Sequence, residues 1–135
     1  MSAAKKILIV DDEEDITILT EKFLQLENYD TLTCSNGYEA LNIIEEKHDE
    51  IELILLDVMM PGMDGYEILT EIKLKYPEIL VVLFTVKNFF EDIQKGKELG
   101  ADGYLVKAIS GNEIIAYIKK ILKKKKKLAS SEPSL

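Results

Sequence analysis

Residues 53–65 of the chain read LILLDVMMPGMDG. Their first four residues are all aliphatic, which is typical of a short strand buried on both faces of a sheet. We expect this strand to end at Asp57, because the segment 61–65 (PGMDG) then supplies loop residues and places Asp64 to cap a following helix. A buried strand followed by a polar residue, a loop and a helix indicates one β–α unit of a parallel sheet.

The same unit recurs along the chain. Further aliphatic runs lead into Asp11, Thr85 and Lys107, and a weaker alternating run over residues 29–34 predicts a half-exposed strand. The intervening segments carry apolar residues three or four positions apart, which is the period of a helix with one buried face. Five such units predict an α/β fold: a five-stranded parallel sheet of order 2-1-3-4-5, flavodoxin-like, with helices on both faces.

Composition excludes several classes of function. Of the 135 residues, 47% are hydrophobic and 31% are charged, as expected for one globular domain. The single cysteine, Cys34, rules out an internal disulfide and a cysteine-rich zinc site, and the single histidine, His48, rules out a metal site built on a histidine pair. No apolar run approaches the ~18 residues of a membrane span, and we expect a cytoplasmic protein.

Charge is divided unevenly along the chain, and all 17 basic residues are lysine. Residues 1–118 hold 10 lysines and 24 acidic residues, a net charge of −14, whereas residues 119–135 hold 7 lysines and one acidic residue, a net charge of +6. Because the acidic body repels nucleic acid, no direct nucleic-acid binding is expected. We divide the chain into a folded domain, residues 1–122, and residues 123–135, a lysine-rich helix end with a tail that we expect to be disordered.

Polar side chains follow four of the predicted strands at the points where these strands end. They are Asp11 and Asp12 after the first strand, Asp57 after the third, Thr85 at the end of the fourth and Lys107 after the fifth. Parallel strands share one carboxyl edge, and such sheets bind ligands there, between the first and third strands. A lone aspartate in such a place is often only a turn residue, but five polar residues at one edge favour a shared site.

Three converging carboxylates need a compensating charge, because two unit charges ~4 Å apart repel by about 4 kcal/mol at an effective dielectric constant near 20. A hard divalent cation such as Mg²⁺ fits best, since it prefers oxygen ligands and the predicted site offers neither thiolate nor imidazole. Together with the Lys107 ammonium and the Thr85 hydroxyl, these groups suit phosphoryl transfer. Asp57, at the end of the central strand, is the best candidate nucleophile.

These segments resemble the receiver domains of response regulators, the family that includes the single-domain regulators of chemotaxis. The matching segments are Ile9 to Glu13 (IVDDE), Leu55 to Gly65 (LLDVMMPGMDG), Thr85 and Gly100 to Lys107 (GADGYLVK). The resemblance extends over roughly residues 5–122. It implies two-component signal transduction in which Asp57 accepts phosphate from a histidine kinase or a phosphotransfer protein. The protein would then be a phosphoacceptor that supports its own phosphorylation and dephosphorylation, not an enzyme with an external substrate.

The resemblance also implies a role for each residue of the site. The implied ligands of Mg²⁺ are Asp11, Asp12, Asp57 and the backbone carbonyl of Met59. Thr85 and Lys107 would contact the phosphoryl oxygens. Tyr104 would be an aromatic switch that turns inward when the Thr85 hydroxyl moves toward the phosphate.

In this family the signal leaves through the face formed by the fourth helix, the fifth strand and the fifth helix. We expect the fourth helix, which contains Gly96, to have low local stability and to shift easily. The implied downstream partner is an effector protein or a C-terminal output domain that this chain lacks. The sequence leaves open whether the protein dimerises when it is phosphorylated.

Two positions depart from the family's pattern. Val86 stands where a small residue usually follows the threonine, and we expect its bulk to slow phosphorylation by small donors. Ala108 stands where a proline with a cis peptide bond is usual. A cis bond before a non-proline residue costs ~2.5–4 kcal/mol, so we expect the bond between Lys107 and Ala108 to be trans.

Two other interpretations stay open at this point. A phosphatase of the haloacid dehalogenase type also uses an aspartyl nucleophile with Mg²⁺, but it needs a second aspartate two residues later, where this chain has Met59. The other is a receiver that acts mainly as a binding module and does not depend on phosphorylation.

Overall fold

The computed structural model describes residues 5–62, 64–86, 90–107 and 109–130. The strands are β1 (Lys6–Val10), β2 (Asp30–Cys34), β3 (Ile51–Leu56), β4 (Leu80–Thr85) and β5 (Gly103–Val106). The helices are α1 (Glu14–Leu26), α2 (Gly37–Lys47), α3 (Gly65–Lys75), α4 (Phe90–Glu98) and α5 (Gly111–Ser130), with a short 3₁₀ turn, η1 (His48–Glu50), before β3. Two predictions fall outside the described residues, namely the state of the peptide bond at Ala108 and that of the tail after Ser130.

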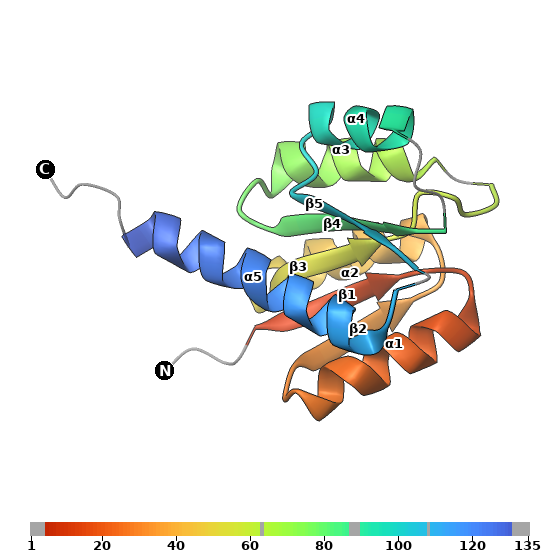
Figure 1. Ribbon diagram of the computed structural model, residues 1–135. Helices are drawn as coiled ribbons and strands as arrows, with labels where there is room; N and C mark the ends of the chain where they lie inside the picture. Colours follow the sequence, from red (N-terminus) through yellow and green to blue (C-terminus); the bar gives the residue numbers. More distant parts are fainter. Residues whose placement is uncertain (1–4, 63, 87–89, 108, 131–135) are drawn as a thin grey trace, which may run out of the picture.

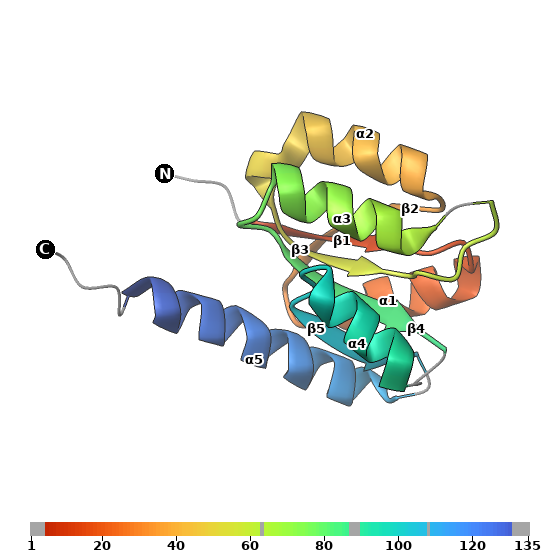
Figure 2. The same ribbon diagram turned by 90° about the horizontal axis from the view of Figure 1, so that it is seen from above.

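The five strands form one parallel sheet in the order β2-β1-β3-β4-β5, which confirms the predicted topology. Helices α1 and α5 cover one face of the sheet, and α2, α3 and α4 cover the other (Figures 1 and 2). The carboxyl ends of all five strands therefore meet at one edge, and the loops that leave this edge come together above β1, β3 and β4.

Burial on both faces explains the uninterrupted aliphatic runs of the sequence. In β1, Ile7 and Ile9 belong to the core beneath α1 and α5, whereas Leu8 and Val10 belong to the core beneath α2 and α3. All four side chains are buried, because the strand lies between β2 and β3 and has helices above and below it. A polar side chain directly after such a strand is therefore the first that can reach solvent or a ligand.

The loop after β3 leads into α3 by the predicted cap. The Asp64 carboxylate accepts a hydrogen bond from the Tyr66 N–H at 2.9 Å, which satisfies one of the free donors at the helix start. Gly65 is buried directly against the loop, and a Cβ at this position would overlap the Cα of Val58. The first turn of α3 is therefore pressed against the segment that follows Asp57, which fixes the course of that segment.

Helix α5 is the longest of the described helices, and its second half extends past the amino edge of the sheet (Figures 1 and 2). Its apolar residues Ile114, Ile115 and Ile118 pack into the core, while the lysine-rich part lies beyond them. None of the helices in the described ranges combines the length and the hydropathy needed to cross a bilayer.

Candidate functional site

Two neighbouring strands each end in a buried aspartate. Asp11 directly follows β1 and Asp57 directly follows β3, and both are 2% exposed. The Asp57 N–H donates to the carbonyl of Val10 at 3.0 Å, and the Asp11 N–H donates to the carbonyl of Cys34 at 3.1 Å. The sheet's hydrogen bonding thus continues one residue past the strands and holds both carboxylates at the same edge.

A third carboxylate completes the acidic group. Asp11, Asp12 and Asp57 each offer one oxygen, and these oxygens lie within 4.8 Å of one another. This is the convergence that the strand-end pattern predicts for residues some 45 positions apart. Asp12 is exposed whereas the other two are buried, so the group has a closed side toward the sheet and an open side toward solvent.

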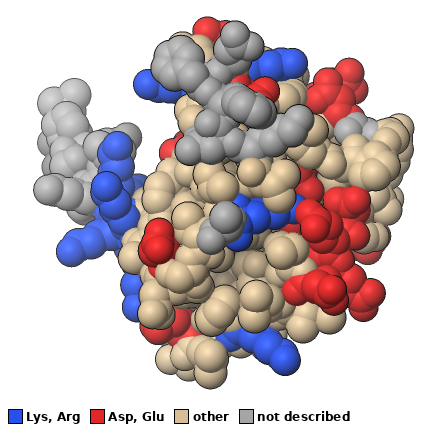
Figure 3. All heavy atoms as spheres, turned by 45° about the vertical axis from the view of Figure 1, so that its right-hand side comes forward, with Lys and Arg blue, Asp and Glu red and all other residues tan. Residues whose placement is uncertain are grey.

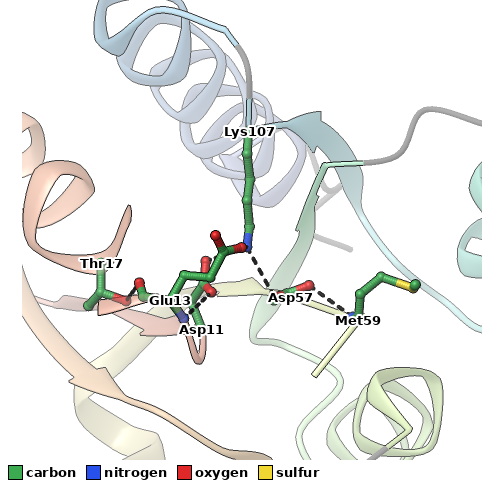
Figure 4. A network of polar contacts seen from close by, with 6 residues as sticks. All are labelled: Asp11, Glu13, Thr17, Asp57, Met59 and Lys107. Carbon is green, nitrogen blue, oxygen red and sulfur yellow. Dashed lines mark hydrogen bonds and ion pairs between the residues drawn. The ribbon is translucent and has the colours of Figure 1, made fainter. Parts of the chain in front are cut away.

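The ammonium of Lys107 binds this acidic group from the end of β5. Its Nζ lies 2.7 Å from Oδ2 of Asp11, 3.0 Å from Oδ2 of Asp57 and 3.0 Å from Oε1 of Glu13 (Figure 4). The lysine side chain is 3% exposed, and its backbone N–H donates to the carbonyl of Thr85 at 2.8 Å. One cation therefore serves three carboxylates in a largely buried place.

The pKa values show that this compensation is incomplete. Burial disfavours the charged form of Lys107, but its hydrogen bonds to the three acids outweigh this effect and raise the pKa of Lys107. Burial also raises the pKa of Asp11, although the Lys107 ammonium and the Glu13 N–H act in the opposite direction. Among the described residues, Oδ2 of Asp11 accepts no well-directed hydrogen bond and is compensated by the ion pair alone.

The acidic group therefore fits a divalent cation. Its donors are carboxylate oxygens, the ligands that Mg²⁺ prefers, and no thiolate or imidazole lies among the three residues that converge. A buried carboxylate oxygen that lacks a good hydrogen-bond donor gains from a second positive charge at this edge.

Backbone amides of the adjoining loops orient the two buried aspartates. Oδ1 of Asp57 accepts a hydrogen bond from the Met59 N–H at 2.9 Å (Figure 4), and Oδ1 of Asp11 accepts one from the Glu13 N–H at 2.9 Å. Each carboxylate therefore has one oxygen fixed by its own loop and the other directed toward Lys107. The Met59 side chain is 49% exposed, so position 59 takes part through its backbone.

Thr85 and Tyr104 lie on the next two strands of the sheet, since β4 pairs with β3 and β5 pairs with β4. Thr85 is the buried last residue of β4, and Tyr104 is a half-buried residue of β5 three positions before Lys107. The Tyr104 N–H donates to the hydroxyl of Tyr117 in α5 at 3.0 Å, and the Tyr104 ring lines a pocket of about 270 Å³ between α4, β5 and α5. Burial, and after it the Asp92 carboxylate, raises the pKa of Tyr104.

The surface around the site is acidic. Asp12, Glu13, Glu14 and Asp15 are all exposed in the loop after β1 and the start of α1. Figure 3, which brings this side of the molecule forward, shows acidic side chains gathered in one area with lysine atoms beside it. This field attracts cations and basic segments of a partner, and it repels a free phosphate anion unless a cation intervenes.

Two residues of the site were missed from the sequence. Glu13, the third acidic partner of Lys107, stands next to the predicted pair Asp11 and Asp12, so its position alone could have suggested it. The second is Tyr117, whose hydroxyl accepts the hydrogen bond of the Tyr104 N–H. In the sequence it stands out only as an apolar position of a helix. That contact could not be found before α5 was placed on the sheet.

Comparison with known proteins agrees with this geometry. The family model described as "Response regulator receiver domain" matches residues 7–119. The alkaline phosphatase synthesis transcriptional regulatory protein PhoP of Bacillus subtilis (strain 168) is 41% identical over 128 residues, which cover 94% of this chain and 52% of that protein. The chain thus spans about half the length of this curated relative.

Solved structures with the same fold are receivers as well. A BeF₃-activated DrrB receiver domain is 34% identical with a TM-score of 0.78, covering 90% of this chain and 99% of the other. A CheY-like receiver domain protein from Methanospirillum hungatei JF-1 is 28% identical with a TM-score of 0.85, covering 93% and 98%. These matches favour the receiver over the haloacid dehalogenase interpretation. With its topology, its acidic strand ends and a family match over most of its length, the chain belongs to the response regulator receiver domains of two-component systems.

Proposed function

We propose that Asp57 accepts a phosphoryl group from the phosphohistidine of a histidine kinase or a phosphotransfer protein. The observation that supports this most directly is the position of Oδ2 of Asp57, 3.0 Å from the Lys107 ammonium in a carboxylate group that opens to solvent on the Asp12 side. A cation held beside the nucleophile stabilises the negative charge that develops on the phosphoryl group during transfer.

In the transfer, an oxygen of Asp57 attacks the phosphorus atom of the phosphohistidine. The new O–P bond forms while the P–N bond breaks, and the imidazole leaves with the bonding electron pair and takes up a proton from solvent. Water later attacks the acyl phosphate, which releases inorganic phosphate and restores the carboxylate. In this scheme the chain supports its own phosphorylation and dephosphorylation and turns over no external substrate.

The residues around Asp57 have separate tasks in this scheme. The Met59 N–H holds one oxygen of Asp57 in place, while the Lys107 ammonium and the Thr85 hydroxyl contact the phosphoryl oxygens. The ligands of Mg²⁺ would be Asp11, Asp12, Asp57 and the backbone carbonyl of Met59. The bound ion would supply further positive charge to the phosphoryl oxygens.

Position 59 also argues against turnover of external phosphate esters. A phosphatase of the haloacid dehalogenase type needs a general acid two residues after its nucleophile, and the thioether of Met59 has no proton to donate. This residue contributes to the site through its backbone, whose N–H donates to Asp57.

We infer that the phosphorylated state is read at the face formed by α4, β5 and α5. Tyr104 lies in this face, and Thr85 lies on the adjacent strand at the level of the site. We propose that Thr85 and Tyr104 change position together, that an effector protein or a C-terminal output domain binds the altered face, and that the chain acts in the cytoplasm.

The test is the intact mass of the protein after incubation with Mg²⁺ and phosphoramidate, a small donor with a P–N bond. We expect one added phosphoryl group on the parent and on Asp49→Ala, a control at an exposed acid far from the site, and none on Asp57→Ala. An unlabelled parent protein, or continued labelling of Asp57→Ala, would contradict the proposal. Sustained release of phosphate from p-nitrophenyl phosphate would instead support the phosphatase interpretation.

A further inference from the structure

A groove lies at the edge of the sheet opposite Asp57, between the second half of α5 and the amino ends of β4 and β5. Its volume is about 440 Å³, within the range of sites that take up a ligand or a few side chains. Leu80, the first residue of β4, and Asp102, which precedes β5, form its sheet side. The groove is separate from the carboxylates around Lys107, and it shares Tyr117 with the pocket that Tyr104 lines.

One stripe of α5 forms the other wall. Its members follow one another at intervals of three and one along the chain, which places them on one side of a helix: Tyr117, Lys120, Ile121, Lys124 and Lys125. Lys120 and Lys124 are exposed, and among the described residues neither has an ion pair or a hydrogen bond. Lys125, which also lines the groove, contacts the backbone carbonyl of Glu78.

The floor of the groove is apolar, and the one acidic residue that lines the groove already has hydrogen-bond donors within the domain. Leu80, Tyr117 and Ile121 are partly exposed there, so apolar surface is open to an occupant. The Asp102 carboxylate accepts hydrogen bonds from the Lys73 ammonium and from the Val81 N–H, both at 2.9 Å. The groove thus combines free ammonium groups with an apolar floor and has little free negative charge.

We propose that this groove binds an acidic peptide segment of a partner protein, with apolar side chains between its carboxylates. The carboxylates would pair with Lys120 and Lys124, and the apolar side chains would cover Leu80 and Ile121. The three groove lysines lie in the part of α5 that follows residue 119, where the family match ends. Binding here does not require phosphorylation of Asp57.

The shape and charge of the groove favour a peptide over other polyanions. A flat bilayer surface reaches the convex side of a helix and cannot enter a concave groove, and duplex nucleic acid offers no apolar groups to the floor. The acidic body of the domain also repels an extended polyanion such as nucleic acid. A short peptide can place its charges on the lysines alone and keep clear of the acidic surface at the opposite edge.

The test is fluorescence anisotropy of labelled peptides with the unphosphorylated protein at physiological salt. One peptide contains Glu and Leu, and the second replaces each Leu by Gln at the same charge. We expect the Glu/Leu peptide to bind at least about fivefold more tightly, because Leu buries apolar surface on the floor.

A pair of double variants separates the groove from general attraction to lysine. Lys120→Gln/Lys124→Gln removes two groove charges, and Lys123→Gln/Lys126→Gln removes two exposed charges of the same helix that do not line the groove. We expect the first to weaken binding about tenfold and the second less than about twofold.

Equal losses in the two double variants would overturn the proposal, and so would equal affinity for the two peptides. Stronger binding of phosphatidylserine vesicles or of duplex DNA with the same lysine dependence would also overturn it, in favour of a membrane or a nucleic acid. All four changed residues are surface lysines, and a thermal melt of each variant checks the fold. Because the protein is unphosphorylated throughout, failure here leaves the role of Asp57 untouched.

Discussion

Replacement of Lys107 by methionine tests the electrostatics of the site directly. The side chain keeps a similar length and apolar stem but loses the ammonium that contacts Asp11, Asp57 and Glu13. The two buried aspartates then face each other without their cation. We expect a large loss of stability in the absence of divalent metal, although both carboxylates keep their backbone hydrogen bonds.

The distances set the size of the effect. Oxygens of Asp11 and Asp57 lie no more than 4.8 Å apart, and two unit charges at that separation repel by about 3.5 kcal/mol at an effective dielectric constant of ~20. Removal of one partner from a buried ion pair typically costs about 3–5 kcal/mol. We therefore expect Lys107→Met to lower the free energy of unfolding by about 3–5 kcal/mol.

The assay is urea unfolding followed by circular dichroism at pH 7 with EDTA. The control is Lys75→Met, which removes an exposed ammonium from a helical pair with Glu71 and should leave the urea midpoint nearly unchanged. Asp11→Asn in the Lys107→Met background should restore at least half of the loss, because it removes one of the two facing charges. Mg²⁺ should stabilise Lys107→Met more than the parent, since the ion replaces the missing cation.

Two results would refute this reasoning. If Lys107→Met unfolds at the same urea concentration as Lys75→Met, the buried carboxylates do not depend on the ammonium. If Asp11→Asn fails to restore stability in the Lys107→Met background, the loss comes from packing of the lysine stem and not from charge. In either case the ion pairs of Lys107 Nζ with Asp11 and Asp57, at 2.7 and 3.0 Å, would not stabilise the fold through their charge.

Three further predictions follow from single residues. Burial raises the pKa of the Cys34 thiol to about 12. Iodoacetamide at pH 8 should therefore label Cys34 far more slowly in the folded protein than in urea. Equal labelling rates by mass spectrometry would count against that burial. Val86 is 60% exposed next to the site, and Val86→Ala should speed labelling by acetyl phosphate; unchanged rates would show that its bulk does not limit access. Gly65→Ala should lower the free energy of unfolding by about 1–3 kcal/mol despite its better helix propensity, because the new Cβ overlaps the Cα of Val58; urea midpoints equal to the parent would contradict this.

The sheet and the meeting of the acids could be predicted from the sequence for one physical reason. Strands buried on both faces must be aliphatic throughout, so the residue after each run marks the edge where the strands end. Asp11 and Asp57 were placed together on that basis alone, and the hydrogen bond between the Asp57 N–H and the carbonyl of Val10 shows why the inference holds. Neither step needs knowledge of side-chain packing.

Contacts that depend on how helices pack could not be predicted in this way. The low local stability that the sequence predicts for α4 stays a prediction, but the close packing of Gly96 could not be predicted: the residue is buried, and a Cβ there would overlap the side chain of Leu83 in β4. The glycine therefore lets α4 approach the sheet closely, which is a packing requirement. The hydrogen bond between Tyr104 and Tyr117 is of the same kind, because it exists only once α5 lies against β5.

The division of one ammonium among three acids makes the site suited to switching. If Asp57 is phosphorylated as proposed, negative charge is added beside Lys107, and we expect the ammonium to be drawn toward the phosphoryl oxygens and away from Asp11 and Glu13. The Lys107 N–H is bonded to the carbonyl of Thr85, so a shift of the lysine acts on the ends of both β4 and β5. Tyr104 lies three residues earlier on β5, and its own N–H is held by α5. A change of charge at Asp57 therefore has a short, hydrogen-bonded route through Lys107 and Thr85 to the face formed by α4, β5 and α5.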